Sequence, residues 1–196
     1  MNLAVRFNKR SGDLYKLSNF YRSEFVYEGI KYRNVEAAFQ AAKTRDIELK
    51  KEISFMLPRD AKRAGRSLVL RSGWEDVKYK IMVDVLMCKY TQNEDLKKIL
   101  LSTGDALIIE DTTGWHDNIW GCCRCERCLG NEVSRNLLGQ ALMEVRAHLR
   151  GEINIIAVAV HRDKEVKIPI DLVYSLEADE LRRCKEVLSL FYKYAE

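Results

Sequence analysis

Residues 35–43, VEAAFQAAK, have the pattern of a short helix with a polar and an apolar stripe. An α-helix turns about 100° per residue, so positions i, i+4 and i+7 lie along one face. Glu36, Gln40 and Lys43 occupy one such stripe, beside an apolar stripe that begins at Val35. Either the polar stripe faces water while the apolar stripe packs into the core, or the polar stripe lines a pocket. The helix alone leaves both interpretations open.

Length and composition indicate one globular domain, or one domain with an appendage. The chain has 196 residues, of which 47% are apolar, with only 2 prolines and 10 glycines, a composition that argues against disorder. No window approaches the roughly 18 uninterrupted apolar residues that a membrane span needs, and the N-terminal stretch MNLAVRFNKR lacks an apolar signal core. We therefore expect a cytoplasmic protein that does not bind a membrane.

Hydrophobic periodicity predicts a helix-rich α+β fold. A hairpin is expected at 25–32, after which Asn34 can cap the helix that carries VEAAFQAAK. Further helices are expected at 46–56, 60–65, 74–90, 93–101, 134–150 and 177–194. Strands are expected at 67–71, 106–111, 153–160 and 166–174. Because helices and strands do not alternate as βαβ units would, we predict a mostly helical domain over residues 1–150, with a C-terminal extension, residues 151–196, that packs on it.

Charge is unevenly distributed along the chain. The net charge is only +4, yet seven basic and three acidic residues lie between Arg59 and Lys80. This local excess either attracts phosphate or forms a solvated charged face.

Four of the six cysteines lie in the stretch CCRCERC. Cys122, Cys125 and Cys128 have the spacing of a thiolate metal knuckle, and Cys123 and His116 are further candidate ligands. Three interpretations fit this stretch: a structural zinc site, reduced free thiols, or a redox or iron–sulfur centre. The clustering suits a thiol or metal cluster in a reducing compartment better than it suits a disulfide framework.

Several motifs together point to a known family. They are LSNFY (17–21), NVEAAFQAAK (34–43), AKRAGR (61–66), RSGWEDVK (71–78), and DNIWG and NLLGQALMEVR within 117–146. In these motifs and their order the chain resembles the NADAR family, also called the YbiA-like family, over roughly residues 17–150. The extension beyond Gly151 lies outside the resemblance.

The resemblance implies hydrolysis of an N-glycosidic bond in a ribose-containing substrate. Some members of the family remove ADP-ribose from guanine bases of nucleic acid, often as antitoxins to DarT-type transferases, and others cleave early intermediates of riboflavin biosynthesis. The cysteines that follow DNIWG resemble the guanine de-ADP-ribosylating branch. The expected partners are ADP-ribosylated nucleic acid, or another ligand that contains ADP-ribose, and an ADP-ribosyltransferase toxin. A non-catalytic module that binds NAD or ADP-ribose is the alternative of another class.

The chemistry of the reaction assigns roles to three residues. Cleavage of a ribosyl C–N bond builds positive charge on the sugar, so an enzyme needs a carboxylate near the anomeric carbon, a proton donor for the leaving amine and a positioned water. The resemblance implies that Glu36, Lys43 and Asp117 are catalytic. Lys43 is either an ammonium that binds ribose or phosphate, or a neutral amine that forms a Schiff base with a ring-opened C1′. A simple ion pair of Lys43 with Glu36 or Asp46 is a third interpretation.

The resemblance also implies a set of substrate-binding residues: Asn19, Phe20, Gln40, Arg66, Arg71, Trp74, Lys78, Trp120 and Gly121. Arg66 and Arg71 are candidates for a pyrophosphate, because a guanidinium fork matches phosphate oxygens. Trp74 and Trp120 either stack on a base or anchor the core. The motif also favours the pocket interpretation of the opening stripe. The reaction requires no cofactor, so no metal is assigned to the catalytic site.

Overall fold

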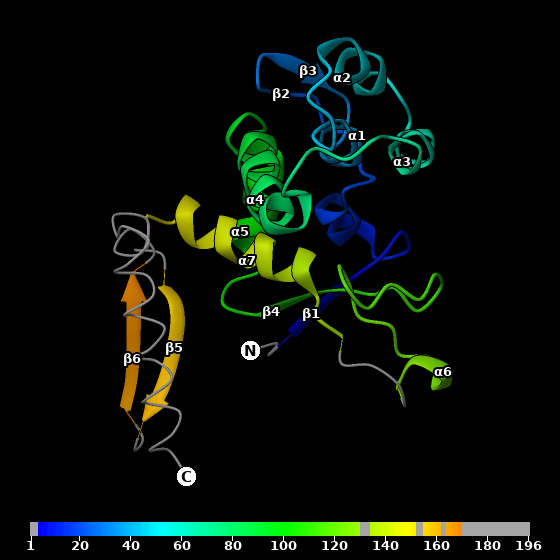
Figure 1. Cartoon of the computed structure of the whole chain (residues 1–196). Coiled ribbons are helices and arrows are strands. Elements are labelled where there is room, and N and C mark those ends of the chain that lie inside the picture. The colour runs from blue at the N-terminus through cyan, green and yellow to red at the C-terminus, as the bar shows by residue number, and fades with distance from the viewer. Residues whose placement is uncertain (1–3, 130–133, 152–154, 162–163, 170–196) are drawn as a thin grey trace. The chain divides into compact units, whose positions relative to one another are not determined.

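The computed structural model of the chain describes residues 4–129, 134–151, 155–161 and 164–169 (Figure 1). The chain divides into two compact units, Met1–Leu149 and Arg150–Glu196. The predicted packing of the extension on the first unit stays a prediction. Among the described helices, none combines the length and the apolar character that crossing a bilayer requires.

Helix α1 (Val35–Ala41) lies among the helices of the first unit (Figure 1). Asn34 caps it as predicted, because its side chain accepts a hydrogen bond of 2.8 Å from the backbone N–H of Ala37. The helix packs against three others: α2 (Ile47–Ser54), α3 (Pro58–Arg66) and α4 (Trp74–Thr91). All seven residues of α1 are buried, including Glu36 and Gln40. The polar stripe therefore does not face bulk water.

The predicted hairpin at 25–32 is confirmed. Strands β2 (Phe25–Tyr27) and β3 (Ile30–Tyr32) pair in antiparallel fashion. The two residues between them, Glu28 and Gly29, both have positive φ, 48° and 76°. A two-residue turn of type I′ requires this conformation at both positions.

A second pair of strands joins segments that lie far apart in the sequence. Strand β1 (Ala4–Phe7) runs parallel to β4 (Leu107–Glu110), with Phe7 opposite Glu110. The sequence predicted β4 but not β1. The pairing brings the loop after β1 beside the end of β4, where the Asp111 N–H donates to the Phe7 carbonyl at 2.9 Å.

The remaining elements of the first unit are mostly helical. They are the 3-10 helix η1 (Gly12–Leu17) and the helices α5 (Glu94–Ser102), α6 (Glu126–Leu129) and α7 (Leu137–Leu149). Helix α7 packs on α4 and β4. It begins three residues later than predicted, because Asn136 adopts a positive φ of 50° and its side chain bonds to β4. The Asn136 Nδ2 donates to the Ile108 carbonyl at 2.8 Å.

The strand predicted at 67–71 is wrong. These residues form a loop after α3, and Val69 is 89% exposed, so the apolar run does not pack into a sheet. Helix α3 itself begins at Pro58 and continues to Arg66, whereas the sequence predicted a helix over 60–65 only. Proline is tolerated in the first turn of a helix, where its missing N–H has no partner to lose.

The described part of the second unit is an antiparallel pair, β5 (Ile155–His161) and β6 (Lys164–Pro169). It confirms the predicted β pair after Gly151. The helix predicted at 177–194 lies outside the described residues. The mixture of helices with short strands confirms the α+β class.

Candidate active site

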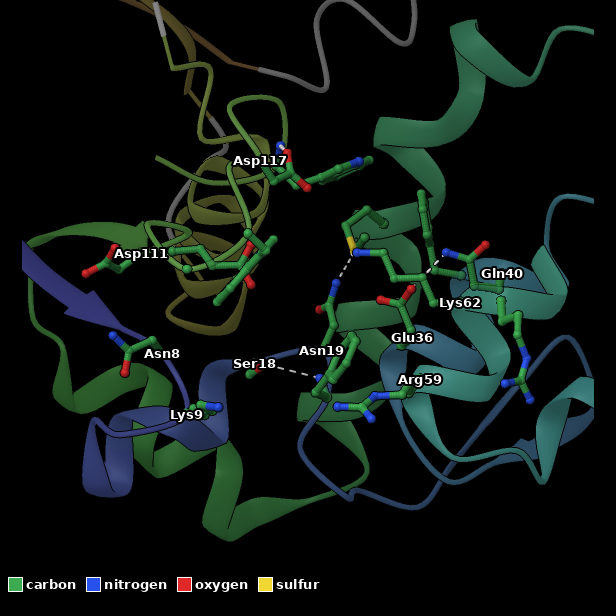
Figure 2. Close-up of a pocket in the computed structure, with 18 of the residues that line it drawn as sticks. Asn8, Lys9, Ser18, Asn19, Glu36, Gln40, Arg59, Lys62, Asp111 and Asp117 are labelled. Atoms are coloured by element: carbon green, nitrogen blue, oxygen red, sulfur yellow. Dashed lines mark hydrogen bonds between the residues drawn. The ribbon is translucent and has the colours of Figure 1, made fainter. Parts of the chain in front are cut away.

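A pocket of about 1270 Å³ collects most of the predicted site residues (Figure 2). Helices α1 and α3 form one side of it, and the loops that follow β1 and β4 form another (Figure 2). Of the twelve predicted residues, ten line the pocket: Asn19, Phe20, Glu36, Gln40, Lys43, Arg66, Trp74, Lys78, Asp117 and Trp120. Arg71 and Gly121 are not part of the lining.

Glu36 is the carboxyl group that α1 contributes. Its side chain is only 6% exposed and accepts a hydrogen bond of 2.8 Å from Gln40 Nε2. Burial raises the pKa of Glu36, and the charge of Asp117 raises it further, whereas the hydrogen bond from Gln40 and the charges of Lys62 and Lys43 oppose the rise. Glu36 and Asp117 therefore act on one another electrostatically within a single pocket.

Besides Asp111, the pocket has a further carboxyl group that the sequence analysis missed, Glu110. It is the last residue of β4, where its N–H donates to Asn136 Oδ1 at 3.2 Å and its carbonyl accepts from the Cys122 N–H at 2.8 Å. Burial raises the pKa of Glu110 to about 8; Asp117 and Glu36 add to the rise, and Lys62 opposes it. The available signal was the acidic pair that closes the apolar stretch ALIIED.

Asp117 lies on the loop that follows β4. Its Oδ1 accepts two backbone hydrogen bonds of 2.9 Å, from Ile119 and Trp120, which fix the direction of the carboxylate. Gly121 follows in the same loop, and a Cβ there would lie 2.2 Å from Thr112 Cγ2. Gly121 allows the loop to pack closely against the chain that leaves β4, and its predicted substrate-binding role stays a prediction.

Lys43 extends the polar stripe of α1 toward α3. Its Nζ lies 3.4 Å from the Gly65 carbonyl and 5.9 Å from the centroid of the Trp74 ring. Burial lowers the pKa of Lys43; the cations Lys62 and Arg66 lower it further, and Glu36 opposes them. The cause is partial burial in a basic environment, which favours the neutral amine.

Four cationic side chains of α3 line the pocket: Arg59, Lys62, Arg63 and Arg66. Their spacing of three and four residues places them on one helix face. Arg66 was predicted to bind a pyrophosphate together with Arg71, but Arg71 is outside the lining and its N–H donates to the Lys43 carbonyl at 2.7 Å. Of the predicted pair, the structure therefore places only Arg66 in the pocket lining, and the phosphate-binding role of both stays a prediction. Lys78, on α4, lines the pocket while it forms an ion pair with Glu75.

Asn19 connects the LSNFY motif to α1. Its carbonyl accepts from the Glu36 N–H at 3.1 Å, and its Nδ2 lies 3.6 Å from Met82 Sδ. Its Oδ1 is buried and has no hydrogen-bond partner among the described residues. The neighbouring Phe20 is 38% exposed, and Lys62 Nζ lies 6.0 Å from its ring centroid. Asn19 therefore lines the pocket with one acceptor atom unpaired among the described residues.

The predicted tryptophans pack on the core at the pocket wall. Phe39 lies 5.2 Å from the Trp74 ring centroid and 5.1 Å from that of Trp120, and Trp74 is only 6% exposed. Trp115, which the sequence analysis did not name, is 48% exposed and also lines the pocket. Among these three rings, Trp115 has the most accessible surface for a base.

Part of the cysteine stretch gathers outside the lining. His116, Cys123, Cys125 and Cys128 form a group that could hold a metal ion. The knuckle spacing predicted Cys122 as a ligand, whereas the structure brings Cys123 into the group.

The part of the chain that matches known proteins contains all the residues that line the pocket. The NADAR domain family matches residues 6–150. N-glycosidase YbiA of Escherichia coli (strain K12) is 34% identical over 148 residues, which cover 74% of this chain and 88% of that protein. The chloroplastic riboflavin biosynthesis protein PYRR of Arabidopsis thaliana is 35% identical over 106 residues, 51% of this chain but 16% of PYRR.

A solved structure agrees with the sequence matches. The NMR structure of the E. coli protein YbiA superimposes with a TM-score of 0.65 at 33% identity, and the match covers 76% of this chain and 87% of that one. The resemblance found from the motifs is confirmed: the chain belongs to the NADAR domain family.

Proposed function

We propose that this chain is an N-glycosidase that removes ADP-ribose from ADP-ribosylated guanine bases in nucleic acid. The observation that carries the proposal is a pocket lined by four carboxyl groups, Glu36, Glu110, Asp111 and Asp117, beside the cationic row of α3. The N-glycosidase part has further support from relatives that are named N-glycosidases. A role as an antitoxin to a DarT-type transferase belongs to the same proposal.

The carboxyl groups can divide the catalytic work. A group with a pKa of about 8, such as Glu110, holds its proton at neutral pH and can donate it to the leaving amine. Glu36 or Asp117, when ionised, can stabilise the positive charge that develops on the ribose or activate water. Two carboxyl groups of different pKa are what acid and base roles in one site require.

Lys43 has two possible roles in this reaction. As a cation, it binds the ribose or a phosphate. As a neutral amine, favoured by its lowered pKa, its Nζ attacks C1′ of the ring-opened sugar, the guanine amine leaves with a proton from an acid such as Glu110, and water hydrolyses the imine to release ADP-ribose. Both routes return the enzyme to its initial state.

The size and charge of the pocket favour a substrate with a pyrophosphate. From Arg59 to Arg66 the α3 row spans seven residues, or about 10 Å at 1.5 Å per residue, which suits more than one phosphate group. The volume of about 1270 Å³ is above the ~300–1,000 Å³ of ordinary ligand pockets. A small riboflavin-pathway intermediate is the second candidate, because PYRR is among the relatives.

One assay tests the proposal. The chain is incubated with guanine-ADP-ribosylated DNA or with a ribosylated riboflavin-pathway intermediate, and free ADP-ribose or free base is quantified, with Glu36→Gln as the control. We expect ADP-ribose to be released from the DNA, and much less by the variant. Release of free base from the small intermediate alone would show that this intermediate, and not the DNA, is the substrate. Binding of ADP-ribose without cleavage of either compound would make the chain a binding module.

A further inference from the structure

Four side chains outside the pocket lining converge on one point, three of them from the loop between β4 and α6 and the fourth, Cys128, from α6 itself. Their ligand atoms all lie within 4.8 Å of one another: His116 Nδ1 or Nε2 and the Sγ atoms of Cys123, Cys125 and Cys128. We call these four residues the His–Cys cluster. No member of the cluster lines the pocket, so the cluster is a site separate from the carboxyl groups.

The contacts within the cluster cannot all be ordinary hydrogen bonds. His116 Nδ1 lies 3.5 Å from Cys123 Sγ, 3.3 Å from Cys125 Sγ and 3.6 Å from Cys128 Sγ. A neutral imidazole nitrogen has a single lone pair, so three thiols cannot all donate to it. Cys123 Sγ and Cys125 Sγ are 3.4 Å apart, far beyond the ~2.05 Å of a disulfide bond.

The three sulfur–nitrogen distances fit the edges of a tetrahedron around one zinc ion, and the 3.4 Å between Cys123 Sγ and Cys125 Sγ is close to such an edge. With Zn–S of about 2.3 Å and Zn–N of about 2.0 Å, the expected separations are about 3.8 Å between two sulfurs and about 3.5 Å between sulfur and nitrogen. We propose that the His–Cys cluster binds one Zn²⁺ as a structural site. Three cysteines and one histidine form a ligand set of structural zinc sites, and soft thiolate ligands favour zinc.

Zinc in this cluster would have a structural role. Four protein ligands fill a tetrahedral site and leave no position for water or substrate. Each Zn–S bond forms as the thiol releases its proton to solvent, so binding is favoured by higher pH. The ion would fasten the loop that carries Trp115 and Asp117, because these residues flank the ligand His116.

Hydrogen bonds and an ion pair hold the ligand-bearing loop in place without the metal. The Cys123 N–H donates to Asn118 Oδ1 at 3.1 Å, and the Arg124 N–H donates to Thr113 Oγ1 at 3.2 Å. The Arg124 guanidinium also pairs with Asp111 at 3.2 Å. These contacts preorganise the ligands, which lowers the conformational entropy that metal binding must overcome.

Cys122 offers a matched control within the same stretch. Its N–H donates to the Glu110 carbonyl at 2.8 Å, and it forms a β-bridge with Asp111. It is not a member of the cluster, although it is adjacent to Cys123. Replacing its side chain removes a thiol from the stretch but no ligand from the proposed site.

The test measures metal directly. The full chain is purified under reducing conditions, and its zinc content is determined by mass spectrometry of the dissolved metal. We expect one zinc per chain in the wild type and in Cys122→Ala, and a large loss in Cys125→Ala and His116→Ala. The apo chain reloaded with Co²⁺ should show the visible absorption bands of a tetrahedral thiolate site.

Two results would overturn the proposal. One is a wild-type chain that holds far less than one zinc after reloading and gives no tetrahedral cobalt spectrum. The other is a Cys122→Ala variant that loses as much zinc as Cys125→Ala. The cobalt spectrum needs only the wild-type chain, so the test does not depend on whether the ligand variants fold, and neither readout depends on enzyme activity.

Discussion

Glu110→Gln isolates the electrostatic cost of the acidic pocket. Burial raises the pKa of Glu110 from 4.5 to about 8, so the folded protein holds a proton that the unfolded chain releases between these pH values. Stability supplied by this proton is complete below pH 4.5 and is lost as the pH rises toward 8. Glutamine is neutral throughout, so the variant should not lose stability in this way.

The size of the effect follows from the two pKa values. At pH 7 the difference from 4.5 is 2.5, and each pKa unit corresponds to about 1.36 kcal/mol, so the wild type loses up to about 3 kcal/mol relative to pH 4.5. This is an upper bound, because Glu36 and Asp117 share the titration with Glu110. For a chain of this size, about 3 kcal/mol corresponds to roughly 6–12 °C in Tm.

The assay is thermal or denaturant unfolding of the wild type and Glu110→Gln at pH 5, 6 and 7. The free energy of unfolding of the variant should exceed that of the wild type by a small amount at pH 5, and the difference should grow at pH 6 and again at pH 7. Comparing the two proteins at the same pH cancels other titrating groups, such as Lys89, whose pKa is lowered to about 7 by complete burial. The exposed Glu52→Gln is the charge-matched control and should show no such growth.

One pattern would refute this reasoning. If the stability difference between Glu110→Gln and the wild type is the same at pH 5 and pH 7, the buried carboxyl does not carry the proton assigned to it. Its candidacy as the proton donor in the reaction would fail with it.

Further predictions concern the other groups of the pocket. Glu36→Gln should lower turnover by about 10²-fold or more with little change in ligand affinity, measured by ADP-ribose release and calorimetry; near-full activity would exclude Glu36. Lys43→Arg should be inactive if Lys43 forms a Schiff base, and an active variant would leave lysine as a positioning cation. Arg66→Ala should weaken ADP-ribose binding by about 10-fold or more, the value of a charge-assisted bond, and unchanged affinity would remove it from phosphate binding. Gly65→Ala should destabilise the fold by about 1–3 kcal/mol in denaturant titrations, because the added Cβ would lie 1.9 Å from Gln40 Oε1; no loss would mean that the two helices can separate freely.

The sequence predicted best what local interactions determine. The cap at Asn34 and the turn at 28–29 depend on a few neighbouring residues, and both formed as expected. The strand predicted at 67–71 failed for the opposite reason: an apolar run indicates a strand only when a neighbouring strand covers it, and Val69 remains exposed. Whether a residue is buried depends on the whole fold, so it cannot be predicted from a few neighbouring residues.

The missed parts of the pocket depend on long-range pairing. Strand β1 has only four residues, AVRF, and its partner β4 begins about a hundred positions later. Without that pairing, nothing in the sequence shows that Glu110 ends inside the pocket. The cysteine stretch also depends on contacts with β4. The knuckle spacing predicted Cys122 as a ligand, but its backbone N–H bonds to the Glu110 carbonyl at the end of β4.

The candidate site has polar residues at buried positions, where packing alone would favour apolar ones. Helix α1 is buried on all sides, so an apolar residue at each position would fold it with less cost, yet Glu36 and Gln40 occupy two of them. Glu36, Glu110 and Asp117 reach the pocket from different segments, and each is held by its own local contacts: the cap of α1, the pairing of β4, and the turn at Asp117. Since burial raises the pKa values of Glu36 and Glu110, the arrangement that costs stability also keeps a proton available near neutral pH. Polar residues retained in a core against this cost are expected at functional sites rather than at structural ones.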